Sequence, residues 1–296
     1  MKMADKSMPD RRAPAKKKGS GAKPDLATIG GLLVAALGLI GGLLLEGGSM
    51  KDITQPTAAI IVLGGTFGAV MVNFPMATLI GGLGRLRHVF FDQSANATEK
   101  IEELVAYATK ARKQGIVSLE RDADELEDPF LKKGLSLAVD GTDLQELRRM
   151  LELEIEQFEH HAGEEAKVWE AAGGYSPTVG IIGAVMGLIQ VMKNLADIDA
   201  VGHGIATAFV ATVYGVAFAN IVFLPAGNKI KVRAQRDVQM MELVVEGISG
   251  IVEGLNPKLI RSKLEAYAHA EAPSKGKKKD AKAPVASSQE NAPAAT

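Results

Sequence analysis

The chain of 296 residues contains no cysteine, which excludes disulfides, thiolate metal sites and cysteine nucleophiles. It also lacks the Gly-x-x-x-x-Gly-Lys-Ser/Thr phosphate loop, so direct nucleotide hydrolysis has no cradle for its phosphates. Charged residues are missing from four long apolar segments and crowd instead into the two ends and one central stretch. These absences argue against an enzyme, and the segregation of charge is typical of a membrane protein.

A helix that crosses a bilayer needs about 20 predominantly apolar residues. Four segments approach or exceed this length, at residues 26–45, 58–83, 177–192 and 204–226. The third is the shortest, and there we expect Ser176 to cap a helix whose first position is Pro177. The sequence therefore predicts an all-α, polytopic membrane protein with four transmembrane helices.

Basic residues set the expected orientation, because Lys and Arg near the ends of spans stay on the cytoplasmic side. They cluster before the first segment, after the second and after the fourth, at Lys16, Lys17, Lys18, Lys23, Arg85, Arg87, Lys229, Lys231, Arg233 and Arg236. We therefore expect both termini and the large central loop in the cytoplasm. A cleaved signal peptide is the alternative for the first segment, but its removal would leave an odd number of spans.

These segments divide the chain into six regions. Residues 1–25 form a basic arm and residues 271–296 a tail, and both are expected to be disordered because they cannot bury a core. The first two spans lie in residues 26–83 and the other two in residues 176–226. The expected cytoplasmic segments are residues 84–175 and 227–270.

Apolar residues in the two cytoplasmic segments recur at helical spacing. One stripe, with Thr98 as its expected cap, runs to Gln114. A second starts near Asp143 and continues toward the third span, and a third follows the fourth span until Asn256 and Pro257 stop it. We expect these helices to form a bundle below the membrane.

Small residues recur every three or four positions in the spans, which places them on one helical face. These faces comprise Gly31, Ala35, Gly38 and Gly42 in the first segment, Gly180, Gly183 and Gly187 in the third, and Gly204, Ala208, Thr212, Gly215 and Ala219 in the fourth. Such faces allow helices to pack closely within one chain or between chains. Several of them in one chain favour assembly into an oligomer.

The four segments hold hydroxyl and amide groups but no acidic, basic or histidine side chain well inside them. Proton and ion carriers normally place ionisable groups there, and hydroxyls and amides cannot take up and release a proton near neutral pH. If ions cross the membrane here, another chain supplies the carboxylate. The alternative is a protein that merely anchors its cytoplasmic domain.

Three stretches carry a resemblance to a known family. Residues 111–120, Ala-Arg-Lys-Gln-Gly-Ile-Val-Ser-Leu-Glu, resemble the cytoplasmic signature of the MotA family of flagellar stator subunits. Residues 176–188 resemble its proline-led third helix, and Ala-Thr-Val-Tyr-Gly at 211–215 with Leu224 and Pro225 resembles its fourth. The related TolQ and ExbB proteins have three spans, so an energising unit of that kind fits less well. A stand-alone secondary transporter would show intramembrane charge or inverted repeats.

The resemblance implies a stator in the bacterial inner membrane, in which a pentamer of this chain surrounds a dimer of the one-span, peptidoglycan-binding partner MotB. The MotB aspartate would bind the ion. Pro177 and Pro225 match the family prolines thought to couple ion passage to cytoplasmic movement, and Arg112 and Glu120 match the charged pair that engages the rotor protein FliG. The alternatives are that Pro177 only starts a helix, that Pro225 only kinks or ends one, and that Arg112 and Glu120 are ordinary solvated charges.

The ion itself is indicated by Ala184. Sodium-driven members of the family carry threonine at this position and proton-driven members tend to carry a small apolar residue, so the resemblance implies a transported proton and no resident cofactor. Thr212 matches a threonine found in both sodium-driven and proton-driven members, so it does not indicate the ion. We expect it to face the pathway. Many members have an acidic residue where this chain has Gly174.

Two further sites are weighed and disfavoured. His160 and His161 lie among glutamates but lack the His-Glu-x-x-His arrangement, so a solvated acidic helix is favoured over a metal site. Basic clusters are confined to the ends of the spans, which makes them topology signals more than nucleic-acid contacts.

Overall fold

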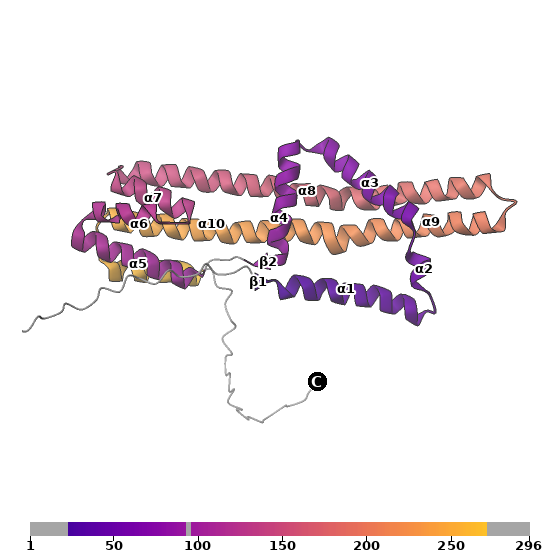
Figure 1. The fold of residues 1–296 in the computed structure, drawn as a ribbon, viewed down its shortest axis with the longest axis horizontal. Coiled ribbons are helices and arrows are strands. Elements are labelled where there is room, and N and C mark those ends of the chain that lie inside the picture. The colour runs from indigo at the N-terminus through magenta and orange to yellow at the C-terminus, as the bar shows by residue number, and fades with distance from the viewer. Residues whose placement is uncertain (1–22, 93–95, 271–296) are drawn as a thin grey trace, which may run out of the picture.

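The computed structural model describes residues 23–92 and 96–270, and within them nearly all of the chain is helical (Figure 1). Two long antiparallel columns run the length of the molecule. The first column is α8 (Leu144–Lys193); the second joins α9 (Ile198–Ala217), the π-helical segment η2 (Phe218–Phe223) and α10 (Leu224–Val252). The remaining elements pack around these columns.

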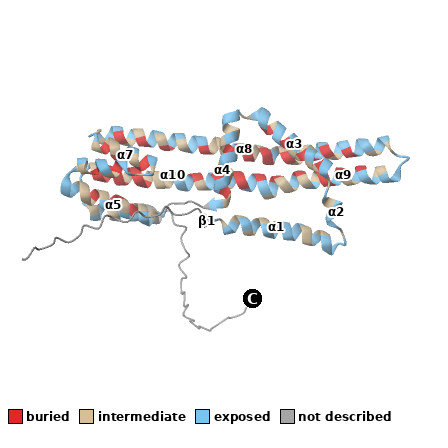
Figure 2. Ribbon diagram, viewed as in Figure 1, coloured by how far each residue is buried: buried red, intermediate tan, exposed pale blue. Residues whose placement is uncertain are grey.

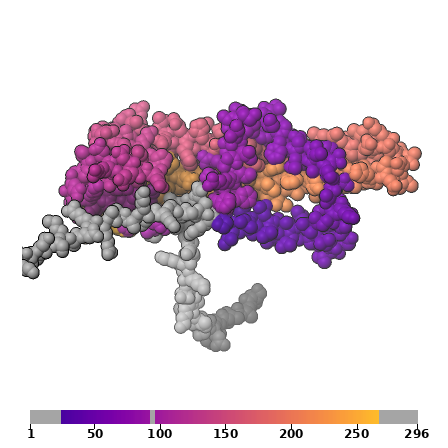
Figure 3. Space-filling model, in the orientation of Figure 1, coloured from indigo at the N-terminus to yellow at the C-terminus, as the bar shows by residue number. Residues whose placement is uncertain are grey.

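The N-terminal elements pack on one half of the columns. They are β1 (Lys23–Pro24), α1 (Leu26–Leu45), α2 (Met50–Ile53), α3 (Pro56–Asn73), α4 (Met76–Phe90) and β2 (Phe91–Asp92). Helix α3 packs on α8 and α9, α4 crosses α8 and α10, and the short strands β1 and β2 pair antiparallel. Helix α1 lies along the outside of the molecule (Figure 3). We call α1 to α4, the C-terminal half of α8, α9 and η2 the membrane half.

The predicted number of spans is confirmed for the described residues, in which four helical segments are long and apolar enough to cross a membrane. The prediction of one helix over residues 58–83 is wrong. Helix α3 ends at Asn73, because Phe74 precedes a proline and is held in an extended conformation. Pro75 then precedes a separate helix, α4, which turns away from α3 (Figure 1). The second candidate span is therefore Met50–Asn73.

The helices that contain the third and fourth spans extend beyond the predicted bounds of those spans. Helix α8 passes without interruption from Asp143, its predicted start, through Pro177 to Lys193, so Pro177 is not a first helical residue and Ser176 is not a cap. The expectation that this helix leads straight into the third span is confirmed. The helix that contains the fourth span begins at Ile198, capped by Asp197, and continues past Ala226 into α10.

The other half of the columns belongs to a helical bundle. It contains α5 (Ala97–Gln114), the 3-10 turn η1 (Ile116–Leu119), α6 (Glu120–Asp124), α7 (Pro129–Val139) and α11 (Pro257–Ala270), with the N-terminal half of α8 and the C-terminal half of α10. Asn96 rather than Thr98 caps α5. The stripe in α10 ends at Val252, and Pro257 starts α11 instead of only stopping a helix.

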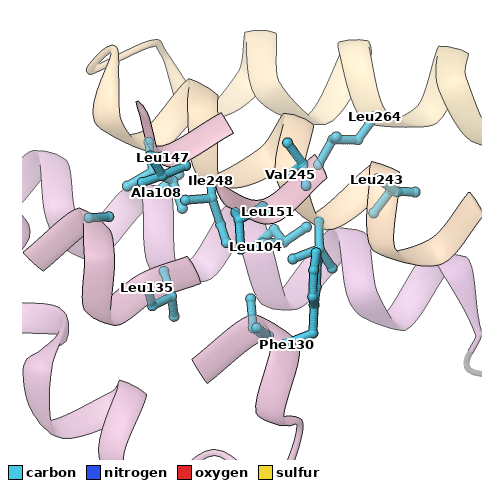
Figure 4. Packing of buried hydrophobic residues seen from close by; sticks show 14 of the residues in the cluster. Leu104, Ala108, Phe130, Leu135, Leu147, Leu151, Leu243, Val245, Ile248 and Leu264 are labelled. Carbon is cyan, nitrogen blue, oxygen red and sulfur yellow. The ribbon is translucent and has the colours of Figure 1, made fainter. Parts of the chain in front are cut away.

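The bundle encloses an apolar core to which each of its long helices contributes (Figure 4). The largest fully buried side chains of this core are Leu104, Leu119, Leu131, Leu135, Leu147, Leu151, Ile248, Ile260 and Leu264. In contrast, α1 has no buried residue at all, and its surface is exposed or half-exposed along its whole length (Figure 2). The basic arm before residue 23 and the tail after residue 270 lie outside the described residues.

Candidate ion pathway and coupling site

Helices α8 and α9 touch through their glycines, so their backbones come into direct contact. A Cβ atom at Gly215 would lie 2.6 Å from the carbonyl oxygen of Ser176, and one at Gly187 would lie 2.7 Å from that of Gly204. Such distances leave no room for a side chain, so only glycine fits there. The small-residue faces predicted in the third and fourth spans therefore pack against each other within one chain.

Pro177 lies at this backbone contact, inside α8. Its Cα atom is 3.3 Å from the position that a Cβ atom of Gly215 would occupy. A proline inside a helix has no N–H to donate, so the carbonyl of Gly173 loses its helical partner. The side chain of Ser176 is fully buried, and its hydroxyl has no hydrogen-bond partner among the described residues. Helix α8 therefore lacks one helical hydrogen bond close to a point where its backbone touches α9.

Thr212 and Ala184 lie on the same pair of helices, and both are half-buried. The hydroxyl of Thr212 donates to the carbonyl of Ala208 at 3.3 Å. The Cα atom of Thr212 lies 3.5 Å from where a Cβ atom of Gly180 would be, and Ala184 follows Gly180 by one turn. Pro177 and Ala184 therefore lie about two turns apart on α8, and Thr212 of α9 faces Gly180 between them.

Pro225 lies elsewhere, at the start of α10 directly after η2, and is exposed. A π-helical turn in a long helix is rare and often marks a functional site. Phe223 of this turn is buried between Phe67 of α3 at 5.8 Å and Trp169 of α8 at 6.2 Å between ring centroids. The indole N–H of Trp169 donates to the carbonyl of Gly82 at 2.9 Å. These aromatic contacts hold η2 against α3, α4 and α8.

The neighbourhoods of the two prolines meet. A Cβ atom at Gly173 would lie 2.5 Å from the side chain of Leu224, the residue immediately before Pro225. Gly173 is also the residue whose carbonyl Pro177 leaves without a helical partner. A change in the bend of α8 at Pro177 would therefore press directly on the column that contains Pro225.

A cluster of charges at the base of α1 was missed by the sequence analysis, which took Lys229 and Arg233 for topology signals. Asp25 caps α1 and forms ion pairs with both of them, although they lie on α10. Lys229 also donates to the hydroxyl of Thr28. Hydrogen bonding to Lys229 holds the pKa of Asp25 well below its usual range. The capping position of an aspartate before an apolar run was the available signal.

Two other polar contacts of the membrane half were also missed. Arg85 of α4, another presumed topology signal, pairs with Glu165 of α8. The hydroxyl of Tyr214, within the matched motif of the fourth span, donates to the carbonyl of Ile53 at the end of α2. Both contacts join elements that are far apart in the sequence, so no local pattern could reveal them.

Arg112 and Glu120 lie far from these groups, on the helical bundle. Arg112 is in the last turn of α5, Glu120 is the first residue of α6, and both are exposed. Gly115 between them has a φ angle of 85°, which favours glycine and makes the sharp turn after α5. Lys110 and Asp122 pair at 2.6 Å and fasten α5 to α6. The two predicted rotor-contact residues therefore lie on either side of a turn whose flanking helices are joined by this ion pair.

His160 and His161 lie on the exposed part of α8, with ring centroids 6.1 Å apart. Among the described residues, no group of three or more His, Cys, Asp or Glu side chains is arranged to hold a metal ion.

Comparison with known proteins identifies the family. Residues 29–115 match the motility protein A N-terminal model, and residues 122–243 match the MotA/TolQ/ExbB proton channel family. Motility protein A of Bacillus subtilis is 36% identical over 249 residues, covering 82% of this chain and 90% of its own length. This chain belongs to the motility protein A group of the MotA/TolQ/ExbB proton channel family.

Solved structures of the same group have the same fold. The structure of C. jejuni MotAB superimposes with a TM-score of 0.78 at 34% identity, covering 82% of this chain and 95% of that one. The flagellar MotAB stator complex from Bacillus subtilis gives 0.75 at 34% identity, covering 82% and 96%. These MotA-type relatives are motility and channel proteins rather than enzymes.

The family matches cover the predicted site residues unevenly. Pro177, Ala184, Thr212 and Pro225 fall inside the channel-family match, and Arg112 falls inside the N-terminal match. Glu120 lies between the two matched ranges. The roles of all six residues remain predictions.

Proposed function

We propose that this MotA-type protein is a stator subunit of a bacterial flagellar motor, which lies in the inner membrane and converts proton flow into torque on the rotor. The observation that carries this proposal is the likeness to two MotAB stator structures over 82% of the chain. Both termini and the helical bundle would face the cytoplasm, because the basic ends of the spans lie at the bundle side.

The partner in this proposal is a MotB-type chain with one span. The candidate spans of this protein contain no ionisable group well inside the membrane, so the carboxylate that binds the ion must come from elsewhere. A pentamer of this chain around a partner dimer would place several α8–α9 pairs around that carboxylate. The exposed apolar surface of α1 and α9 is consistent with further contacts to lipid or other chains.

The two columns provide the path for coupling. Each passes from the membrane half into the bundle without a loop, so a movement at Pro177 or Pro225 is carried into the bundle by a continuous helix. The contact of Gly173 with Leu224 links the two columns next to these prolines. An allosteric connection of this kind requires an element with two arrangements. We assign that role to the turn at Pro177, which has lost a helical hydrogen bond.

Arg112 and Glu120 are the residues that we assign to FliG. Exposed charges contribute little to the stability of a fold, but they steer and align a charged partner. Ala184 supports protons over sodium, because its methyl group offers no oxygen to replace water around a sodium ion.

The test is swimming in cells that lack their own stator and receive this chain with its one-span partner. We expect motility with both chains and none with either alone. Arg112→Glu and Glu120→Lys should reduce swimming while leaving membrane insertion unchanged. Arg149→Glu is the matched control, because Arg149 is an exposed charge elsewhere on the bundle. Equal loss in all three variants, or normal swimming in both test variants, would remove the rotor assignment.

A further inference from the structure

An apolar cavity of about 390 Å³ lies beside α1, at the end of the membrane half that adjoins the bundle. Its walls come from the first turns of α1, the last turns of α4, η2 and the start of α10. Gly31, Asn220 and Val222 in this wall are exposed, so the cavity opens to the outside of the chain. Of the residues assigned to the ion pathway and coupling, Pro225 lines the cavity, whereas Pro177, Ala184 and Thr212 do not.

The cavity has the size of a small-ligand site. Ligand pockets of roughly 300–1,000 Å³ are common, so a slender apolar ligand fits. Gly31 leaves the wall open, since no heavy atom lies within 4 Å of a Cβ atom built there.

One end of the cavity carries a lysine, the one charged residue of its described lining. Lys229 lines the cavity, and Asp25 is the carboxylate that pairs with both Lys229 and Arg233. Arg233 is otherwise occupied with the backbone carbonyls of His88 and Phe91. The described lining contains no acidic residue, and the carboxylate of Asp25 is shared between two cations.

Lys229 can bind a further acceptor. An ammonium group has three N–H donors, and the carboxylate of Asp25 and the hydroxyl of Thr28 accept two of them. Thr28 itself donates to the carbonyl of Val89 at 3.3 Å, so both groups are held at the cavity wall. An anionic group at this point would meet a positioned cation at the level where the membrane surface begins.

We propose that this cavity binds an anionic phospholipid, with an acyl chain between α1 and η2 and the phosphate at Lys229. Basic pockets between transmembrane helices at the cytoplasmic surface bind acidic headgroups, and each basic residue favours an anionic lipid by about fivefold. The acyl chain would cover apolar surface of α1 that the protein itself leaves unburied. The proposal goes beyond the stator function, because it needs only this chain in a membrane.

Trp169 is a built-in reporter for the test, since the chain has a single tryptophan. It is buried in the same cluster as Val89 and Ala226, which line the cavity. The full-length chain would be reconstituted in vesicles of phosphatidylcholine that contain a small fraction of bromine-labelled phosphatidylglycerol or bromine-labelled phosphatidylcholine. Bromine on an acyl chain quenches tryptophan fluorescence at short range, so the quenching reports occupancy of the cavity.

We expect labelled phosphatidylglycerol to quench Trp169 at about one fifth of the concentration that labelled phosphatidylcholine requires. Lys229→Gln should abolish this preference, and Lys229→Arg should retain it. Lys231→Gln is the matched control, because Lys231 pairs with Glu170 and does not line the cavity. Gly31→Phe should fill the cavity and reduce quenching by both lipids.

Three outcomes would overturn the proposal. Equal quenching by the two lipids in the unmodified chain would show that the site does not select charge. A preference that survives Lys229→Gln would place the acidic headgroup elsewhere. Absence of quenching by either lipid would mean that a second copy of this chain, rather than lipid, fills the cavity.

Discussion

The helical bundle and the membrane half share the same two columns but are held together by different contacts. The bundle closes around large apolar side chains such as Leu104, Leu135 and Leu151, all fully buried. The membrane half relies on backbone contacts between glycines, while many of its large apolar side chains remain exposed. Water drives side chains into the first core, whereas lipid provides no such force, so close packing must replace it.

The largest effect is expected where backbones touch in the membrane half. Gly215→Leu would place a side chain against the carbonyl of Ser176 and the Cα atom of Gly180, neither of which can move aside. We expect loss of the assembled protein and of motility. Gly38→Leu is the control, because no atom lies within 4 Å of a Cβ atom there. Membrane-fraction yield and swimming measure both, and equal damage at Gly38 would show that α1 is as tightly packed as α9.

The bundle should respond as a water-soluble core does. Leu151→Ala removes a fully buried side chain and should cost about 2–5 kcal/mol of unfolding free energy. Leu153→Ala, on the same helix but 54% exposed, should cost far less. Thermal unfolding of the purified chain compares the two, and similar losses would mean that the bundle core does not carry the stability assigned to it.

The charge cluster between the two regions should have an intermediate effect. Asp25→Asn keeps a capping oxygen for α1 but removes the charge that two cations share, so we expect a loss of roughly 1.5–3 kcal/mol at neutral pH. Because the pKa of Asp25 is lowered by folding, its stabilisation is complete above its unfolded pKa of about 3.9 and declines as the pH falls below it. The difference in unfolding free energy between the unmodified protein and Asp25→Asn should therefore shrink as the pH falls below about 3.9. A difference that stays constant with pH would mean that the variant loses a contact other than the charge interaction.

The smallest effect belongs to the surface of the bundle. Lys110→Ala breaks the pair with Asp122, in which both side chains are about one third exposed, and should cost less than about 1 kcal/mol. If the ion pair holds Arg112 and Glu120 in place, swimming should fall more than stability does. The free energy of unfolding and the swimming speed of this variant decide the question. If both fall in parallel, the ion pair has no role beyond stability.

The sequence predicted what depends on local composition. The four spans, the start of α8 at Asp143 and the continuity of α8 into the third span all follow from apolar length and spacing. Two of the errors in the predicted spans came from prolines. Pro75 divides a segment that looked continuous, whereas Pro177 stays inside a helix, because neighbouring helices can support a turn that has lost a hydrogen bond.

The site was only partly predictable for a different reason. The glycine faces of the third and fourth spans predicted close packing, but one sequence could not show which helix each face packs against. The pairing of Asp25 with Lys229 joins residues more than two hundred positions apart, and the contact of Gly173 with Leu224 depends on the register of two columns. Such contacts are consequences of the tertiary structure.

Proton entry is the measurement that tests the central claim most directly, followed as internal pH in stator-less cells expressing this chain, its one-span partner, or both. We predict entry and rotation only with both chains, no requirement for sodium, and arrest by a protonophore. Proton entry with this chain alone would contradict the inference that another chain supplies the carboxylate. Rotation that requires sodium would contradict the role assigned to Ala184.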